Sequence, residues 1–165
     1  MMRPITDELI QGMIQQAAAS PRGRVPYNFH EAHEPVQRMI NALVPGTYVT
    51  PHKHEDPDKV ELIAVLSGRA AMLHYGDDGA IEQIFIMDAD GPVRGVDIPA
   101  RVYHNFVALT PCAVLEIIQG PYNPDTHKKF APWAPKEGTP ETTAYLAQLE
   151  TVIGQKLQET TISGQ

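Results

Sequence analysis

Two histidines separated by one residue, His52 and His54, are the first residues whose types and spacing could support chemistry. They stand in a stretch that we expect to be extended, and side chains two positions apart on a strand point to the same face. Two imidazoles on one face can bind a single metal ion at about 2.0–2.1 Å. The spacing therefore predicts part of a metal site.

Glu61 and His104 are the candidates for the rest of that site. Glu61 shares a predicted strand face with Ile63 and Val65, so its carboxylate is expected to point into the core, where an unpaired charge is costly. His104 also has apolar neighbours on its own face, among them Val102. A bound metal ion would remove the cost of burying these polar groups.

Five further residues are candidates for proton or substrate chemistry. Glu116 interrupts an apolar run, so it is expected either inside the fold, as a partner of the site or a general base beside Glu61, or on an outer face beneath a helix. Arg38 and Arg101 would need an acid or an anionic ligand if they face inward, and surface salt bridges are the alternative. His30 and Tyr103 complete the candidate substrate contacts, although an aromatic ring such as that of Tyr103 more often belongs to a core.

Two other histidines are not assigned to the site. His74 is interpreted as a hydrogen-bonded structural histidine, and His127, beside two lysines, as a solvated one.

The elements that must position these residues are mainly short β-strands. The expected strands cover residues 37–44, 60–66, 69–75, 81–87, 93–98, 103–109 and 112–119. Only Ser67-Gly68 separates the second from the third, which predicts a tight hairpin. Seven or eight short strands with closely spaced turns favour a sandwich or a barrel over alternating strands and helices.

A helix is expected at each end of the chain. One covers residues 6–19, with Thr6 as its N-cap, and the other covers residues 140–158, beginning after Thr139. The barrel core is expected over residues 36–120. Residues 121–138 are expected to form an ordered proline-rich loop, because their aromatic rings favour packing. The length of 165 residues predicts a single domain over residues 1–165.

Composition excludes several function classes. The net charge of -7, from 13 basic and 20 acidic residues, disfavours binding to nucleic acid. No run approaches the roughly 18 apolar residues of a membrane helix, so no membrane association is expected. The single cysteine, Cys112, excludes an intrachain disulfide and is expected to be a buried small hydrophobe. The first residues lack the apolar region of a secretory signal, so a cytoplasmic location is expected.

The spacing of the metal-site residues resembles the first cupin motif, in which a glycine precedes His-x-His, a glutamate and a second glycine. The matching residues are Gly46, His52, His54, Glu61 and Gly68. Six residues separate His54 from Glu61, where cupins usually have three or four, and this insert leaves Glu55 and Asp56 as alternatives to Glu61. The second cupin motif is matched by Pro99 and His104, with Arg101 in place of a glycine.

The chain as a whole resembles the WbuC-type cupin-fold metalloproteins. The residues that carry this resemblance are Asn28-Phe29-His30, Gln37-Arg38-Met39, Pro51-His52-Lys53-His54, Lys59-Val60-Glu61, Gly120-Pro121-Tyr122 and Trp133-Ala134-Pro135, within about residues 22–138. The resemblance implies a mainly β, single-domain cupin jelly-roll barrel, a double-stranded β-helix, that binds a divalent metal. Members of this family often accompany polysaccharide biosynthesis. Cupins commonly pair through sheet edges, so a homodimer is expected by analogy.

Three imidazoles and one carboxylate suit Zn, Fe, Mn, Ni or Co, and the sequence does not choose among these divalent metals. The function expected first is a metal-dependent isomerase, epimerase or lyase acting on a small polar substrate, sugar-like or anionic. In that function the metal would polarise the substrate, and Glu61 or Glu116 would handle protons. An iron-dependent dioxygenase, a non-catalytic ligand-binding module and a purely structural metal are the alternatives.

Overall fold

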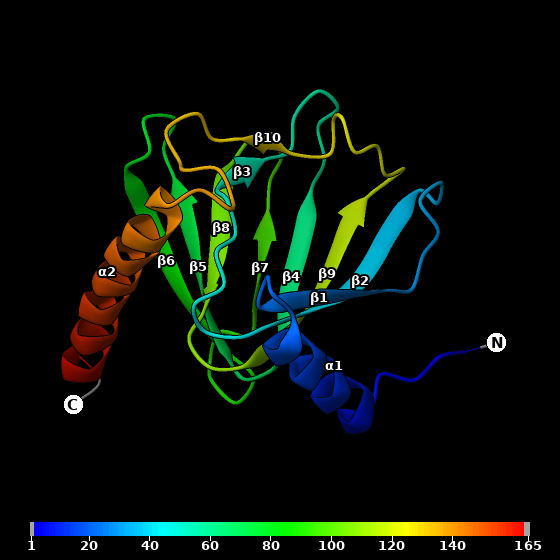
Figure 1. Cartoon of the computed structure of the whole chain (residues 1–165), viewed down its shortest axis with the longest axis horizontal. Helices are drawn as coiled ribbons and strands as arrows, with labels where there is room; N and C mark the ends of the chain where they lie inside the picture. The colour runs from blue at the N-terminus through cyan, green and yellow to red at the C-terminus, as the bar shows by residue number, and fades with distance from the viewer. Residues whose placement is uncertain (1, 164–165) are drawn as a thin grey trace.

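Two antiparallel five-stranded sheets, flanked by two helices, make up the computed structural model, which describes residues 2–163 (Figure 1). The first sheet has the strand order β1-β2-β9-β4-β7 and the second has the order β10-β3-β8-β5-β6. The strands are β1 (Arg24–Asn28), β2 (Val36–Leu43), β3 (His52–Lys53), β4 (Glu61–Ser67), β5 (Arg69–Tyr75), β6 (Ile81–Asp88), β7 (Gly95–Ile98), β8 (Tyr103–Ala108), β9 (Cys112–Gln119) and β10 (Lys129–Phe130). The mainly β jelly-roll architecture predicted from the sequence is confirmed.

The space between the sheets is filled by side chains from alternate strand positions. In β4, Ile63 and Val65 are buried, whereas Leu62 between Glu61 and Ile63 is 42% exposed. Ile63 and Val65 pack with Met72 of the facing sheet in one apolar core. This alternation fixes which residues can reach the interior of the barrel.

Helix α1 (Asp7–Ala19) covers the outer face of the first sheet. The Thr6 side chain accepts a hydrogen bond from the backbone N–H of Leu9 at 3.2 Å, which caps the helix. Ile10 and Met13 then pack against Ile40 of β2. The helix therefore covers the outer face of the first sheet and contributes no residue to the interior of the barrel.

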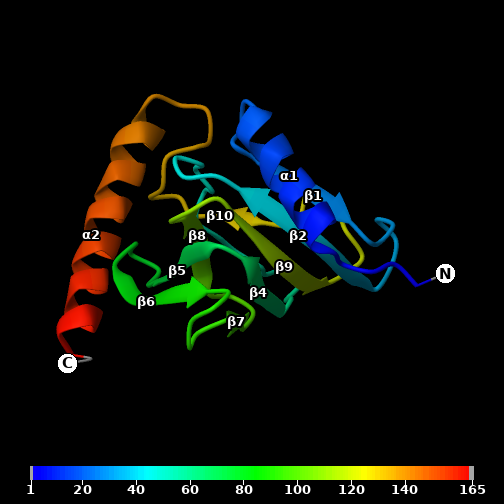
Figure 2. The same cartoon turned by 90° about the horizontal axis from the view of Figure 1, so that it is seen from below.

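Helix α2 (Glu141–Ser163) covers the outer face of the second sheet, on the opposite side of the molecule (Figure 2). Leu146, Leu149 and Ile153 are buried in one cluster with Leu73 and Tyr75 of β5. The helix continues five residues beyond the expected end at residue 158. Within residues 2–163, neither helix has the length and apolar character needed to cross a membrane.

The hairpin predicted at Ser67-Gly68 is wrong. β4 pairs with β7 and β9, whereas β5 pairs with β6 and β8, so the two strands belong to different sheets. Gly68 has a φ of 74°, and a Cβ at this position would lie 2.3 Å from the carbonyl oxygen of Pro111. Only glycine fits at this position, where the chain crosses from one sheet to the other. Ser67-Gly68 is therefore a turn between the two sheets.

Residues 121–138, which we call the strap, lie across the end of the second sheet (Figure 1). The strap contains the two-residue strand β10, in which Phe130 pairs with His52 of β3. The Trp133 ring packs against the rings of Tyr75 and Tyr103, with centroid distances of 5.1 and 5.8 Å. The strap is therefore anchored to the barrel beside the histidines of β3.

Candidate metal centre

Four buried side chains converge inside the barrel. One nitrogen or oxygen atom from each of His52, His54, Glu61 and His104 lies within 4.8 Å of the others, and each residue is only 3% exposed. His52 lies on β3 and is paired with His104 on β8, which brings their ring centroids to 4.7 Å. Glu61 begins β4 on the facing sheet. The structure thus brings together the four residues expected to form the metal site.

The alternative carboxylates of the insert lie outside this cluster. Glu55 is paired with Lys53 at 3.0 Å and also with Lys129. The side chain of Asp56 is 77% exposed. Glu61 is therefore the carboxylate that faces the three histidines.

Backbone oxygens determine how the three imidazoles are oriented. The Nδ1 atoms of His52, His54 and His104 lie 2.9, 2.6 and 2.9 Å from the carbonyl oxygens of Thr50, His127 and Val102. A carbonyl oxygen can only accept a hydrogen bond, so each Nδ1 carries the hydrogen. In the neutral rings, Nε2 is then left with a lone pair for a ligand.

The donor atoms of His54, His104 and Glu61 are spaced as ligands of one divalent metal ion would be. The Nε2 atoms of His54 and His104 lie 3.0 and 3.1 Å from Oε2 of Glu61. Lone pairs of neutral imidazoles and a carboxylate repel one another at this distance unless a proton or a metal cation lies between them. Two ligands placed at right angles, each about 2.1 Å from one ion, would be about 3.0 Å apart, which agrees with the spacing found. Backbone acceptors on the far nitrogens are also typical of metal-bound histidines.

The electrostatics favour the forms that bind metal. Burial lowers the pKa of His52 well below its ordinary value, because the protonated ring loses its hydration. Burial raises the pKa of Glu61, but hydrogen bonds from the His104 and His54 rings, which they donate when Nε2 carries a proton, outweigh it, and the net direction is well below the ordinary value. A neutral imidazole and an ionised carboxylate are the ligand forms of these side chains.

Glu116 lies inside the barrel, which decides between the two positions expected from the sequence. It is opposite Ile63 in the pairing of β4 with β9, so it shares the inner face with Glu61. Its Oε2 accepts a hydrogen bond from Nδ2 of Asn41 at 2.7 Å. Burial, together with the negative charge of Glu61, raises the pKa of Glu116 to about 8. Asn41 was not among the site residues expected from the sequence, although an amide in the middle of a strand is unusual enough to be a signal.

The two candidate arginines form surface salt bridges. Arg38 lies two positions from Ile40, on the face of β2 that packs against α1, and pairs with Glu34. The side chain of Arg101 is 58% exposed and its Nε donates to Asp58 at 2.9 Å. The structure brings neither guanidinium into the cluster.

His30 and Tyr103 also have other partners. Nδ1 of His30 lies 2.8 Å from both the backbone N and O of Arg38, so this ring supports the pairing of β1 with β2. Tyr103 precedes His104 on β8 and therefore faces the outer side, where it packs in the cluster beneath α2. Nζ of Lys53 lies 4.5 Å from the centre of the Tyr103 ring.

The expectation that His127 is solvated is wrong. His127 is 7% exposed, and its ring centroid lies 5.2 Å from that of His54 and 4.8 Å from that of Tyr122. Burial lowers the pKa of His127 to about 3, so its ring is neutral. The backbone oxygen of His127 orients His54. Every residue has such an oxygen, so this role could not be predicted from the residue type.

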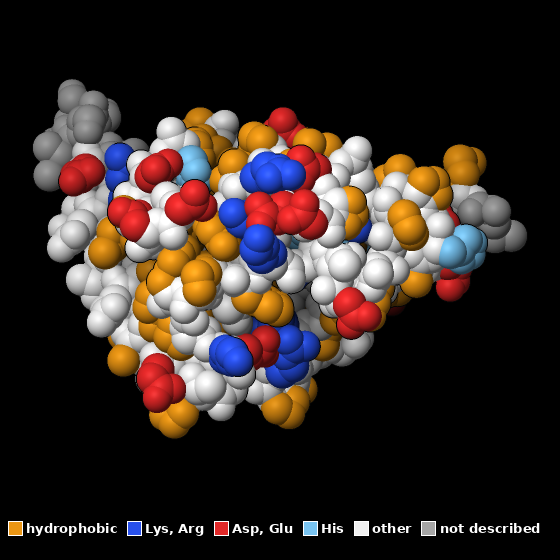
Figure 3. Space-filling model, turned by 90° about the horizontal axis from the view of Figure 1, so that it is seen from above, with side chains coloured by type: hydrophobic (Ala, Val, Ile, Leu, Met, Phe, Trp, Pro, Cys, Tyr) orange, Lys and Arg blue, Asp and Glu red, His pale blue; other side chains and the backbone are white. Residues whose placement is uncertain are grey.

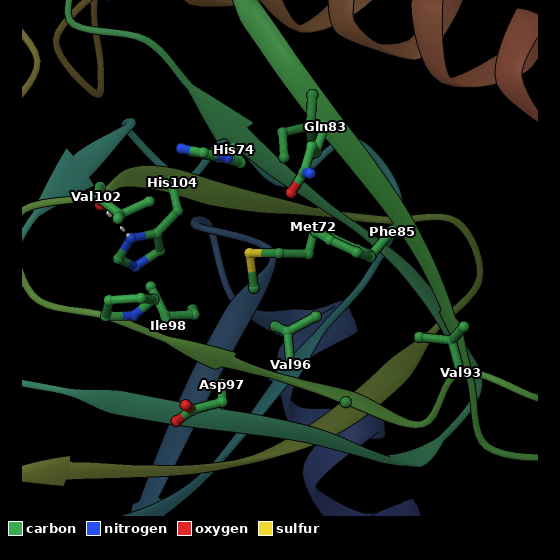
Figure 4. A pocket seen from close by; sticks show the side chains of 13 residues that line it. Met72, His74, Gln83, Phe85, Val93, Val96, Asp97, Ile98, Val102 and His104 are labelled. Atoms are coloured by element: carbon green, nitrogen blue, oxygen red, sulfur yellow. Dashed lines mark hydrogen bonds between the residues drawn. The ribbon is translucent and has the colours of Figure 1, made fainter.

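A cavity of about 520 Å³ reaches the cluster at His104 (Figure 4). It lies between β6 and β7, the edge strands of the two sheets. His74, interpreted from the sequence as structural, lines this cavity directly opposite His104 in the pairing of β5 with β8. Nε2 of His74 is also 3.4 Å from the carboxylate of Glu82.

The end of the molecule that carries β3 and β10 shows charged side chains of both signs, close to one another (Figure 3). Salt bridges link several of them. Lys53 and Lys129 both pair with Glu55, and Arg101 pairs with Asp58. These three basic side chains are therefore partly neutralised by their neighbours.

Sequence comparison identifies the family of the chain. The family described as "Domain of unknown function (DUF6016)" matches residues 5–87, half of the chain. The protein belongs to the DUF6016 family. No curated protein matches this chain in sequence.

Solved structures similar to this DUF6016 protein share the cupin fold. The capsular polysaccharide assembling protein CapF from Staphylococcus aureus is 23% identical with a TM-score of 0.56, over 67% of this chain and 30% of CapF. Oxalate oxidase in complex with glycolate is 18% identical with a TM-score of 0.52, over 70% of this chain and 58% of the oxidase. Oxalate decarboxylase from B. subtilis is 15% identical with a TM-score of 0.53, over 67% of this chain and 29% of the decarboxylase.

These comparisons establish the fold and leave the activity open. This DUF6016 chain spans about a third of the length of CapF. The resemblance to cupins is confirmed by the structural neighbours, whereas the finer resemblance to the WbuC-type proteins stays a prediction.

Proposed function

We propose that the protein is a cupin-fold metalloenzyme that holds one divalent transition metal ion with His52, His54, Glu61 and His104 and acts on a small molecule. The observation that carries this proposal is the convergence of three imidazoles and one carboxylate in a buried space. Each imidazole is locked by a backbone carbonyl with Nε2 free for the ion.

The cavity that reaches the cluster favours a metal ion that binds a ligand over a purely structural metal ion. Structural sites are closed by protein ligands, whereas catalytic sites keep a position open for water or substrate. The cavity between β6 and β7 ends at His104 and supplies such an approach. We therefore favour catalysis at this centre.

The surrounding residues suit proton transfer within a bound substrate. A divalent ion at this centre would act as a Lewis acid toward a carbonyl or hydroxyl group. Glu116, held by Asn41 on the same inner face as Glu61, is placed to hold or release a proton. We propose an isomerase, epimerase or lyase reaction on this basis.

The biological setting comes from the sequence alone. The WbuC-type resemblance favours a role in polysaccharide biosynthesis. The homodimer and the cytoplasmic location likewise remain predictions from the sequence.

Elemental analysis of the purified protein tests the metal site. We expect about one divalent transition metal ion per chain, and we expect the double substitution His52→Ala with His104→Ala to empty the site. His33→Ala, at an exposed histidine, is the matched control and should keep full occupancy. Full occupancy in the double variant would show that the site has been misplaced.

Substitution of Glu116 tests the catalytic part of the proposal. Glu116→Gln keeps an oxygen that can accept from Asn41 but removes the acid. We expect this variant to retain its metal and to lose turnover of any isomerisation, epimerisation or elimination substrate found by screening. Undiminished turnover would remove Glu116 from the mechanism.

A further inference from the structure

We propose that the ligand of this metal centre has an apolar body, which occupies the cavity between β6 and β7, and a polar head that meets the cluster beside His104. This inference rests on the proposed metal site and adds the chemical class of its ligand. It differs from the sugar-like substrate expected from the sequence.

Strand register shows that the cavity is lined by inward-facing side chains of both sheets. On the second sheet, Phe85 lies opposite Met72 in the pairing of β5 with β6. On the first sheet, Val96 lies opposite the buried Ile63 in the pairing of β4 with β7. Residues directly opposite each other share a face, so Met72, Phe85 and Val96 all point between the sheets.

The walls of the cavity are mainly apolar. Figure 4 shows Met72 pointing into the space bounded by His104, Ile98 and Val96. Val93 and Phe85 line the part of the cavity farther from His104. A volume of about 520 Å³ lies in the range of small-molecule sites, which are typically apolar with a few polar groups.

Besides His104, the polar side chains that line the cavity are His74 and Gln83, which lie near the metal cluster, and Asp97, which is opposite the exposed Leu62 and therefore belongs to the outer face of β7. His74 is opposite His104 across β5 and β8, and Gln83 is opposite His74 across β5 and β6. Ile98 is opposite Glu61 across β4 and β7, so the cavity also ends next to this ligand. A molecule in the cavity would therefore place one end beside two ligands of the ion and the other end among apolar side chains.

This distribution of polarity selects against sugars and against ligands with an anionic body. Hydroxyl groups buried against Met72, Phe85 and Val96 would lack partners, and unpaired buried polar groups are costly. None of the described residues that line the cavity is Lys or Arg, so an anionic body would have no counter-charge there. An aliphatic or aromatic body fits these walls.

Two hydroxamic acids that share a metal-binding head and differ in their apolar body provide the test. We would titrate the zinc-loaded protein with acetohydroxamic acid and with octanohydroxamic acid by calorimetry. Burying the longer chain should make octanohydroxamic acid bind about 30-fold more tightly or better, because each buried methylene contributes to affinity.

Matched variants assign that difference to the cavity. Val96→Glu places a carboxylate on the inner wall and should abolish the preference for the longer probe while acetohydroxamic acid still binds. Leu62→Glu is the control. Leu62 lies on the adjacent strand β4, next to the residue that is opposite Val96, but it faces the outer side and is 42% exposed. If Val96→Glu does not fold, Phe85→Ser at the 37% exposed Phe85 should reduce the preference instead.

The outcomes separate this inference from the proposed function. Equal affinity of the two probes for the wild-type protein with one zinc ion per chain would overturn the inference and leave the metal site standing. An absence of zinc by elemental analysis, with no binding of either probe, would overturn the metal site and the inference with it.

Discussion

Nδ1 of His54 lies 2.6 Å from the backbone oxygen of His127, a hydrogen bond that spans 73 positions of the chain. The strap therefore belongs to the candidate metal centre through its backbone. Its first residue is also tethered, because Nζ of the buried Lys59 donates to the carbonyl oxygen of Pro121 at 2.9 Å. Any change that loosens the strap should reach the metal through the ring of His54.

Loss of the Lys59 tether should weaken metal binding. Lys59→Met removes the donor to Pro121 while keeping most of the apolar stem, so His127 should hold His54 less firmly. Substitutions among groups that orient metal ligands typically lower affinity about 10–100-fold, and we expect the lower end of this range. Competition with a chromophoric chelator measures the change. Lys136→Met makes the same substitution at an exposed position of the strap and should leave affinity unchanged; equal losses in both variants would contradict the tether.

Metal binding should raise the thermal stability of the protein. The cluster of His52, His54, Glu61 and His104 is buried with its lone pairs facing one another, so a cation should favour the folded state. Free metal at about 100 times its Kd adds about 2.7 kcal/mol, which for a chain of this length raises Tm by roughly 5–10 °C. Differential scanning calorimetry with and without a chelator measures this shift. The shift should vanish in the variant that combines His52→Ala with His104→Ala, and its persistence there would locate the bound metal elsewhere.

Much of the barrel could be predicted because strand alternation is a local property. Residues 69–75 and 112–119 were predicted with the bounds that β5 and β9 have. The inward direction of Glu61 also followed from Ile63 and Val65 on the same face. The candidate metal site was accessible to this reasoning because the side chains proposed as its ligands are of characteristic type and spacing.

The features that were missed depend on which strands become neighbours. Ser67-Gly68 has the composition of a hairpin turn, but nothing local shows that β4 and β5 enter different sheets. The cavity is formed by Phe85 and Val96, which pair with separate strands and are brought together by the facing of two sheets. β1 contains Pro26, which is tolerated because β1 is an edge strand. Sequence patterns carry little information about any of these relationships.

Replacement of the glycine in the turn between the two sheets should destabilise the fold. In Gly68→Ala the new Cβ would meet the carbonyl oxygen of Pro111 at 2.3 Å, in a backbone conformation with φ of 74° that side chains rarely adopt. We expect a loss of about 2 kcal/mol in the free energy of unfolding, measured by urea denaturation. Gly154→Ala is the opposite control, since a Cβ there meets nothing within 4 Å and alanine favours a helix by up to about 1 kcal/mol. A neutral result for Gly68→Ala would mean that this turn can move.

The contribution of Glu137 to stability should depend on pH. Oε1 and Oε2 of this carboxylate are 2.8 and 2.6 Å from the guanidinium nitrogens of Arg22 and Arg24, which join the strap to the start of β1. The hydrogen bond with Arg22, followed by that with Arg24, lowers the pKa of Glu137 to about 2 from an ordinary 4.5. The folded state thus releases this proton more readily than the unfolded state, so the stabilisation is complete above about pH 4.5 and is lost as the pH falls toward 2.

Comparison of Glu137→Gln with the wild type isolates this pH dependence. At pH 6 the variant should be less stable by up to about 1 kcal/mol, a modest value because the Glu137 side chain is partly exposed and solvent screens the pair. The difference between the two proteins should shrink as the pH is lowered from 4.5 to 3, measured by urea unfolding at each pH. Glu150→Gln, at an exposed residue of α2, should show no comparable pH-dependent difference from the wild type. A constant difference between Glu137→Gln and wild type over this range would show that Glu137 stabilises the strap by packing, without a contribution from its charge.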